Sequence, residues 1–180
     1  MNPIKRVAIF CGSKTGEKEI YAQHAVEFAS LLAKYKIELV YGGGKKGLMG
    51  IVADTVMQQD GIVRGVIPKV LTEWEHQHDS LSELLVVDDM HIRKRKMYEL
   101  CDAAMILPGG FGTLDELFEI LTWNQLSIHD KQVFMLNSGG FYDLLLKHMN
   151  FLAAEGFLWG ELENQVTVID SPSAFEKYIS

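Results

Sequence analysis

A glycine-rich segment followed by a threonine and a glutamate has the residue types needed to bind a phosphate group. Residues 108–116 read Pro-Gly-Gly-Phe-Gly-Thr-Leu-Asp-Glu and directly follow an apolar run at residues 103–107. Glycines let a ligand approach the backbone closely, and the unpaired N–H groups at a helix start, aided by the helix dipole, attract an anion. The predicted phosphate-binding residues are Gly109, Gly110, Gly112 and Thr113.

The spacing of Thr113 and Glu116 also has a second interpretation. A Thr followed three residues later by a Glu matches a capping box, in which the two residues satisfy each other's backbone N–H groups at a helix start. Capping explains these two residues but not three glycines within four positions. The residues alone therefore leave open whether Glu116 has a functional role in a ligand site or only caps the helix.

A basic segment, residues 93–96, follows two aspartates. Four consecutive cations usually form a solvated helix face. Helical geometry separates them, however, because Arg93 lies beside the apolar stripe of this segment whereas Arg95 points away from it. The stripe consists of Met90, Met97 and Leu100. If the helix begins at the same sheet edge as the glycine loops, we expect Arg93 to enter a shared pocket.

A second glycine loop, residues 42–47, matches the G-x-G-x-x-G pattern of dinucleotide-binding folds. Such folds place an acidic residue at the end of the next strand to bind the ribose, whereas this chain has Pro68 and Lys69 there, and Asp60 precedes that strand. The loop can equally be a tight strand-to-helix turn. Neither this loop nor residues 12–16 has the spacing of an ATP-hydrolysing phosphate loop.

Short β-branched runs alternate along the chain with longer segments of helical period. This order is typical of βαβ units and predicts a doubly wound α/β fold, with a mainly parallel sheet and helices on both faces. Strands are predicted at residues 7–10, 37–41, 62–67, 84–87, 103–107, 132–136 and 166–169. Helices are predicted near residues 18–35, 48–59, 90–100, 113–126, 141–155 and 173–178. Ligands of such folds bind beyond the carboxyl ends of the strands, where the segments described above converge.

Composition indicates an ordinary globular protein. The 180 residues fit one nucleotide-binding domain, residues 1–180, with 48% hydrophobic residues and no apolar run long enough to span a membrane. A net charge of −7 disfavours nucleic acid as a partner. The N-terminal residues lack a signal-peptide pattern, so we expect a cytoplasmic location. Cys11 and Cys101 are expected to be buried and unreactive.

One long polar stretch, residues 68–81, contains two histidines near acidic residues. The histidines are His76 and His78, and the acidic residues are Glu73, Glu75 and Asp79. A metal site is conceivable, but no further Cys or His stands at ligand spacing, so a solvated flap is favoured. We expect no metal.

The two sharpest motifs together resemble those of the LOG family, the cytokinin riboside 5′-monophosphate phosphoribohydrolases, often labelled lysine decarboxylase-like. The family pattern M-H-x-R-K followed by P-G-G-x-G-T-x-x-E stands here at residues 90–94 and 108–116, and the resemblance covers nearly the whole chain. It implies a Rossmann-like sheet, a homodimer, a nucleoside 5′-monophosphate substrate and no metal or redox cofactor. It also implies that Arg93 and Glu116 form the catalytic pair.

The resemblance implies hydrolysis of the bond between base and ribose. Further substrate contacts are expected from Ser13, Gly43, Gly44, Met90 and Lys94. Departures from the commonest family pattern leave the preferred base open; they are Lys14, Ile92, Phe111 and Asp115. No lysine stands in a recognisable pyridoxal-phosphate context, so decarboxylation is not supported.

Two other classes of function stay open: a nucleotide-binding or cofactor-carrier module without turnover, and an NAD-dependent oxidoreductase. For the homodimer that the resemblance implies, apolar residues of the helix near 113–126 are candidates for the interface. They are Leu117, Phe118, Leu121, Trp123 and Leu126.

Overall fold

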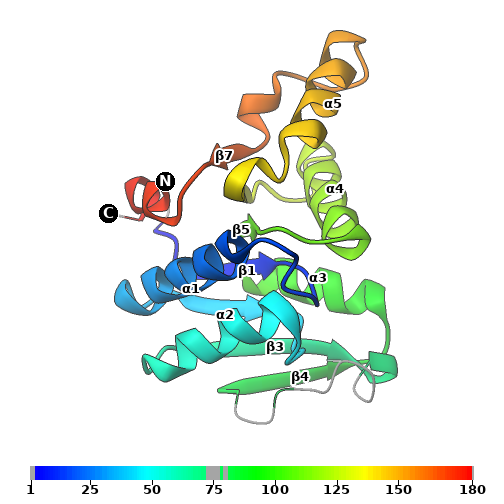
Figure 1. Ribbon diagram of the computed structural model, residues 1–180. Coiled ribbons are helices and arrows are strands. Elements are labelled where there is room, and N and C mark those ends of the chain that lie inside the picture. Colours follow the sequence, from blue (N-terminus) through cyan, green and yellow to red (C-terminus); the bar gives the residue numbers. More distant parts are fainter. Residues whose placement is uncertain (1–2, 72–77, 79–80, 180) are drawn as a thin grey trace.

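The computed structural model describes residues 3–71, 78 and 81–179. Within them, seven strands form one parallel sheet in the order β4-β3-β2-β1-β5-β6-β7 (Figure 1). The strands are β1 (Arg6–Phe10), β2 (Glu38–Tyr41), β3 (Val63–Pro68), β4 (Glu83–Val87), β5 (Ala103–Ile106), β6 (Gln132–Leu136) and β7 (Thr167–Ile169). The predicted α/β fold is confirmed, and each strand begins and ends within one residue of its predicted bounds.

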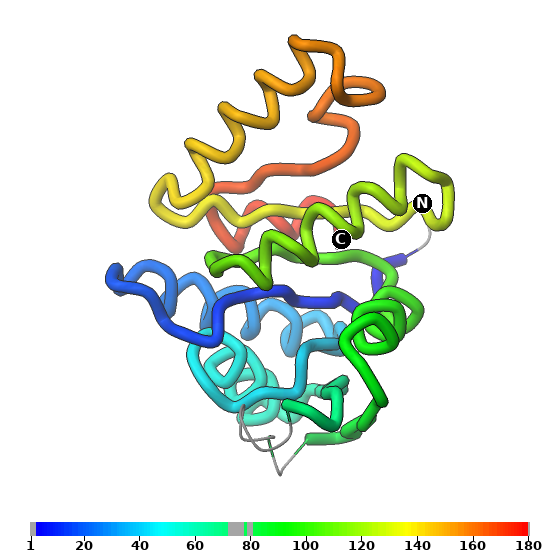
Figure 2. The backbone as a smooth tube through the Cα atoms, turned by 90° about the vertical axis from the view of Figure 1, so that its right-hand side faces the viewer, coloured from blue at the N-terminus to red at the C-terminus, as the bar shows by residue number. Residues whose placement is uncertain are grey.

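Helices cover both faces of the sheet, as the smooth backbone trace shows (Figure 2). The α-helices are α1 (Glu19–Lys34), α2 (Gly47–Gln58), α3 (Met90–Leu100), α4 (Phe111–Gln125) and α5 (Asp143–Ala154). Short 3-10 helices are η1 (Lys69–Leu71), η2 (Ser138–Gly140), η3 (Leu162–Asn164) and η4 (Pro172–Tyr178). One buried cluster lies beneath α1, α2 and η4, and a second lies beneath α3, α4 and α5.

Strand β1 lies at the centre of the sheet and contributes side chains to both cores. Because side chains alternate along a strand, Val7 and Ile9 join the cluster on one face, while Ala8 and Phe10 join the other. The strand order reverses at β1, which pairs with β2 on one side and β5 on the other. The crevice beyond its carboxyl end is therefore the expected ligand site of this topology.

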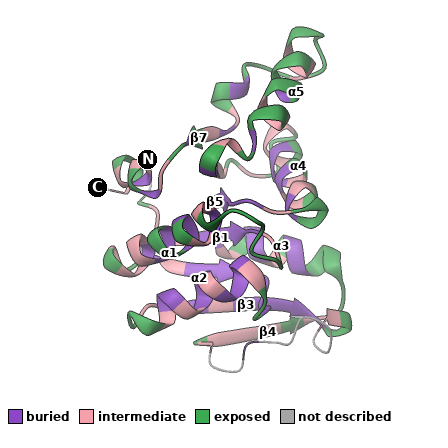
Figure 3. Cartoon of the chain, viewed as in Figure 1, coloured by how far each residue is buried: buried purple, intermediate pink, exposed green. Residues whose placement is uncertain are grey.

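Most residues of α5 and of the segment that follows it are exposed (Figure 3). Within α5 only Met149 is buried, and Leu144 and Phe151 are exposed.

The set of candidate interface residues on α4 needs correction. Leu117 and Leu121 lie in the protein's own core, because the apolar stripe of α4 faces the sheet. Phe118, at 40% exposure, and Leu126, at 65%, are the exposed members, and Trp123 is half-buried.

The predicted flap is wrong at His78, the one histidine of that stretch within the described residues. Its side chain is buried, its Nε2 lies 2.8 Å from Asp54 Oδ1 on α2, and its backbone N–H donates to Gly43 O at 3.1 Å. An acceptor supplied by another element makes this burial possible, and sequence spacing does not reveal it. His76 and the three acidic residues of the stretch lie outside the described residues.

Both cysteines are buried, as predicted. Burial raises the pKa of the Cys101 thiol to about 11. No helix of the described ranges is long and apolar enough to cross a bilayer. The same residues contain no group of three or more His, Cys, Asp or Glu side chains arranged to hold a metal ion.

Candidate active site

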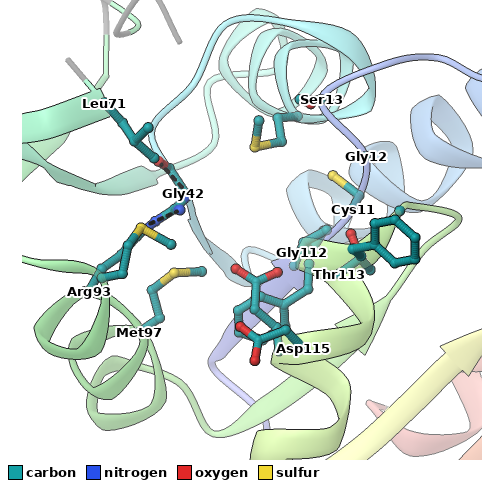
Figure 4. A pocket seen from close by; sticks show the side chains of 17 residues that line it. Cys11, Gly12, Ser13, Gly42, Leu71, Arg93, Met97, Gly112, Thr113 and Asp115 are labelled. Atoms are coloured by element: carbon teal, nitrogen blue, oxygen red, sulfur yellow. Dashed lines mark hydrogen bonds between the residues drawn. The ribbon is translucent and has the colours of Figure 1, made fainter. Parts of the chain in front are cut away.

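A cavity of about 290 Å³ lies at the reversal point of the sheet, beyond the carboxyl end of β1 (Figure 4). This is near the lower limit of ordinary small-molecule sites, which span roughly 300–1,000 Å³. Its walls come from the loops after β1, β2 and β5, from η1, and from the first turns of α3 and α4. Segments far apart in the sequence therefore meet around one space.

Backbone hydrogen bonds hold these loops together. The Gly12 N–H donates to Pro108 O at 3.0 Å, and the Leu48 N–H at the start of α2 donates to Gly12 O at 3.0 Å. On the other side, the buried Tyr142 hydroxyl donates to Leu107 O at 2.6 Å. The loop after β1 is thus hydrogen-bonded to the glycine segment on one side and to the start of α2 on the other.

Helix α4 begins at Phe111, two residues earlier than predicted, and this start rules out the capping box of Thr113 and Glu116. Gly110 is the N-cap and, as a glycine, has no side chain that could accept a capping hydrogen bond. Thr113 is the third residue of the helix, so it cannot be its N-cap. The capping-box interpretation is wrong because a capping Thr must precede the helix. The N-cap and the first three residues of α4 line the cavity, and the first N–H groups of a helix have no intrahelical partner, which is the arrangement of an anion site.

The three glycines of this segment have different roles. A Cβ added to Gly109 would overlap Thr113 Oγ1 and lie 3.0 Å from Gly12 N, so Gly109 is required by packing between loops. A Cβ added to Gly110 or Gly112 would have no described atom within 4 Å. Both of these glycines line the cavity, so their missing side chains leave room for a ligand at the helix start.

Arg93 reaches the opposite wall of the cavity from α3. This helix begins with a capped turn, in which the Ile92 N–H donates to Asp89 Oδ1 at 2.8 Å. Arg93 is 5% exposed, and its Nη2 donates to the Gly42 carbonyl at 3.1 Å (Figure 4). Its Nε donates to the Val66 carbonyl, also at 3.1 Å. Arg95 is exposed. The predicted orientation of both arginines is confirmed.

Gly42 is required by this arrangement, because a Cβ there would overlap Arg93 Nη2. Gly42 is not among the residues predicted for the site. Its position directly after β2 is a signal that could have identified it, since that end of the strand faces the ligand crevice.

Glu116 lines the same cavity from the second turn of α4 and is half-buried. Burial raises the pKa of the Cys11 thiol far above its usual range, and the negative charge of Glu116 raises it further. The carboxylate therefore acts at the end of β1, where Cys11 also lines the cavity. Cys11 contributes a neutral thiol wall beside the Glu116 charge.

The cavity brings together most of the predicted site residues. Those that line it are Ser13, Met90, Arg93, Gly110, Gly112, Thr113 and Glu116. Gly109, Gly43, Gly44 and Lys94 do not line it. Gly43 has a φ of +79° and lies against Ile67 and Leu84, and the Lys94 ammonium contacts two carboxylates.

Sequence reasoning missed the apolar part of the wall. Met49, Leu71 and Met97 line the cavity from α2, η1 and α3. Met97 was placed on the apolar stripe of its helix, but nothing in the local pattern distinguishes a methionine beside a ligand from one in the core. Only the meeting of three elements at one sheet edge identifies these residues.

Comparison with known proteins identifies the family. Residues 49–179 match the family model described as "Possible lysine decarboxylase". The probable cytokinin riboside 5′-monophosphate phosphoribohydrolase LOGL1 of rice is 44% identical over 171 residues, 95% of this chain and 76% of that protein. The phosphoribohydrolase LOG1 of Arabidopsis thaliana is 43% identical over 172 residues, 96% of this chain and 80% of that protein. The chain belongs to the LOG family.

This LOG-family chain also resembles several solved structures in its fold. The molybdenum cofactor binding protein from Rippkaea orientalis has a TM-score of 0.72 at 21% identity, covering 99% of this chain and 97% of that one. The Moco carrier protein from Chlamydomonas reinhardtii has a TM-score of 0.72 at 18% identity, covering 99% and 98%. Identities this low show a shared fold and nothing of the chemistry.

The different roles of the glycines give a prediction about the stability of this LOG-family protein. Gly109→Ala should lower the free energy of unfolding by about 1–3 kcal/mol, because the added methyl group overpacks two fixed loops. Gly112→Ala, the matched control inside α4, should leave it unchanged or raise it by up to about 1 kcal/mol, because alanine favours the helix. Urea unfolding of both variants measures the difference. Equal stabilities of the two variants would contradict the assigned packing role.

Proposed function

We propose that this chain hydrolyses the N-glycosidic bond of AMP or of a cytokinin riboside 5′-monophosphate, releasing the free base and ribose 5-phosphate. The observation that carries the proposal is that Arg93 and Glu116 line one cavity together with the start of α4, whose N-cap is a glycine. The rice and Arabidopsis relatives, 44% and 43% identical over nearly the whole chain, are named for this reaction.

The 5′-phosphate is assigned to the start of α4. Gly110 and Gly112 leave open space there, and the buried Thr113 and the loop residue Ser13 stand beside it. Backbone N–H groups and the helix dipole hold an anion without a lysine cluster. This local arrangement suits a chain whose net charge of −7 repels anions overall. Binding energy from the phosphate then positions the reacting bond.

Charge development during the reaction assigns the two catalytic residues. As the C1′–N bond breaks, its electron pair leaves with the base and positive charge grows on the ribose ring. The Glu116 carboxylate stabilises that positive charge and orients or activates a water molecule, whose oxygen bonds to C1′; the water gives up one proton and the departing base takes up one. Glycoside hydrolases use carboxylates in the same chemical role. The Arg93 guanidinium assists the departing base or anchors the nucleotide.

Dinucleotide-dependent oxidation has less support from the site. In dinucleotide folds the second glycine of the G-x-G-x-x-G pattern lets the backbone approach the pyrophosphate, but Gly44, which stands at that position, does not line the cavity. At the end of β3, Lys69 pairs with Asp88, its Nζ 2.6 Å from Oδ1, where a ribose-binding acid is required. A carrier without turnover is favoured only by the shared fold of the cofactor-binding structures.

Lysine decarboxylation, the name of the matching family model, is also not favoured. None of the described residues that line the cavity is a lysine. Burial lowers the pKa of Lys94, but its hydrogen bonds to Glu119 and Asp115 outweigh this effect and raise the pKa. A lysine held in its charged form is the opposite of the neutral amine that a Schiff base requires.

The first test concerns the phosphate. Catalytic efficiency on AMP should exceed that on adenosine by at least 10²-fold, because the best-formed part of the site binds an anion and remote binding energy assists the reacting centre. Chromatographic detection of adenine from both substrates measures the ratio. Comparable efficiencies would remove the basis for the phosphate assignment. A panel of N6-substituted monophosphates in the same assay identifies the preferred base.

The second test concerns Glu116. Glu116→Gln keeps the size of the side chain and removes its charge, so turnover should fall by something on the order of 10² to 10³. Ribose 5-phosphate binding, measured by calorimetry, should stay unchanged because the start of α4 is intact. The melting temperature should also stay within a few degrees, since Glu116 does not cap the helix. Turnover close to that of the wild type would overturn the catalytic assignment.

We also propose that the protein is located in the cytoplasm and that it is a homodimer whose interface lies beside the cavity. Exposed apolar side chains support this interface. Phe111, at 93% exposure, stands at the cavity, and Phe118 and Leu126 follow on the outer side of α4. Ile128, in the turn after α4, is 59% exposed. Isolated exposed apolar residues are common, but several along one helix are typical of protein contacts.

Light scattering tests the homodimer. At micromolar concentration the wild type should have twice the mass of one chain, and Phe118→Asp should shift it toward the monomer because a buried charge destabilises an apolar interface. Leu144→Asp, an equally drastic change on the exposed side of α5, serves as the control and should leave the mass unchanged. A wild-type monomer at these concentrations would overturn this part of the proposal.

A further inference from the structure

A buried lysine joins the two helices that carry the catalytic pair. Lys94 follows Arg93 on α3, and its side chain is 7% exposed. Its Nζ lies 3.0 Å from Asp115 Oδ2 and 2.9 Å from Glu119 Oε1, both on α4. The lysine that was expected to bind substrate is thus held between two carboxylates, and the two ion pairs connect α3 to α4.

A tyrosine one turn further along α3 continues this connection. The Tyr98 hydroxyl lies 3.0 Å from Glu119 Oε2 and 3.3 Å from the backbone oxygen of Glu116. Its ring is buried and packs against Phe10 and Trp123, with centroid separations of 5.8 and 5.2 Å. The backbone of the catalytic glutamate is therefore contacted by a side chain of the helix that carries the catalytic arginine.

Glu119 is the centre of this network. Lys94 contacts one of its oxygens and Tyr98 contacts the other, so both acceptors of a carboxylate with a side-chain exposure of 20% are used. Such pairing is required, because a buried carboxylate without partners is strongly unfavourable. Each contact fixes α4 against α3 at the turns where Glu116 and Arg93 stand.

We propose that Lys94, Tyr98 and Glu119 form an interhelical clamp that fixes the separation between the Arg93 guanidinium and the Glu116 carboxylate, and that they are positioning residues for the reaction. The inference rests on the proposed function. Because misplacing a catalytic group by about 1 Å can cost on the order of 10² in rate, a clamp beside the pair acts on turnover. It does not act on the phosphate site, which lies at the start of α4.

The test uses variants that weaken the clamp by different amounts. Tyr98→Phe removes one oxygen and keeps the aromatic packing. Lys94→Met combined with Glu119→Gln removes both charges, so no unpaired buried carboxylate is left. Lys96→Met is the matched control, because Lys96 pairs with Glu99 on the same helix, at 3.3 Å and in an exposed position, and this pair does not reach α4.

The kcat and KM for AMP are measured for each variant, with ribose 5-phosphate affinity from calorimetry. The kcat of the double variant should fall on the order of 10- to 100-fold, and that of Tyr98→Phe about 3- to 10-fold, because group placement sets the rate. KM and ribose 5-phosphate affinity should stay within about 3-fold, because phosphate contacts at the helix start are retained. Lys96→Met should match the wild type.

An unchanged kcat in both clamp variants overturns the inference. A weakened ribose 5-phosphate affinity with kcat retained also overturns it, because it would make Lys94 a phosphate ligand. If the double variant does not fold, Tyr98→Phe decides. A wild type inactive on every monophosphate sinks the proposed function instead; crystal structures of the wild type and Tyr98→Phe then test the clamp by the separation of Arg93 and Glu116.

Discussion

The burial of two consecutive cations on α3 is the constraint on which the rest of the site depends. A charge removed from water is costly unless each of its donors finds an acceptor. Arg93 finds one backbone carbonyl within β3 and one directly after β2, and Lys94 finds two carboxylates on α4. Satisfying both therefore fixes α3 against the sheet on one side and against α4 on the other. Gly42 follows from the same constraint, because only a residue without a Cβ leaves room for the guanidinium.

The glycines of this chain show why a motif does not by itself define a ligand site. Gly42, Gly43 and Gly109 are each close to protein atoms, whereas Gly110 and Gly112 face open space at a helix start. The first three allow loops and side chains to approach one another, and the last two leave room for a ligand. Their letters in the sequence are identical, so the distinction depends on which elements pack around each position.

Much of the fold could be predicted from sequence because its signals are local. Seven β-branched runs separated by helical segments were enough to predict the parallel sheet. The apolar stripe beside Arg93 was enough to predict the direction of the Arg93 side chain. The predictions that failed concern residues whose environment depends on partners from other parts of the fold. The start of α4 at Phe111 removes the capping box, and the carboxylates of α4 bury Lys94. Asp54, distant in sequence, buries His78 within a stretch whose composition indicated a solvated loop.

The polarity of the cavity wall has a consequence for how a nucleotide fits. The start of α4 supplies N–H groups and the helix dipole at one end, while methionines of α2 and α3 and Leu71 of η1 form an apolar surface elsewhere. A phosphate at the first end and a base against the second place the ribose between them. In the proposed reaction, Glu116, which lines the same cavity from the second turn of α4, is the carboxylate that acts on C1′. The separation of α3 from α4 then determines whether Arg93 and Glu116 can act on the same bond.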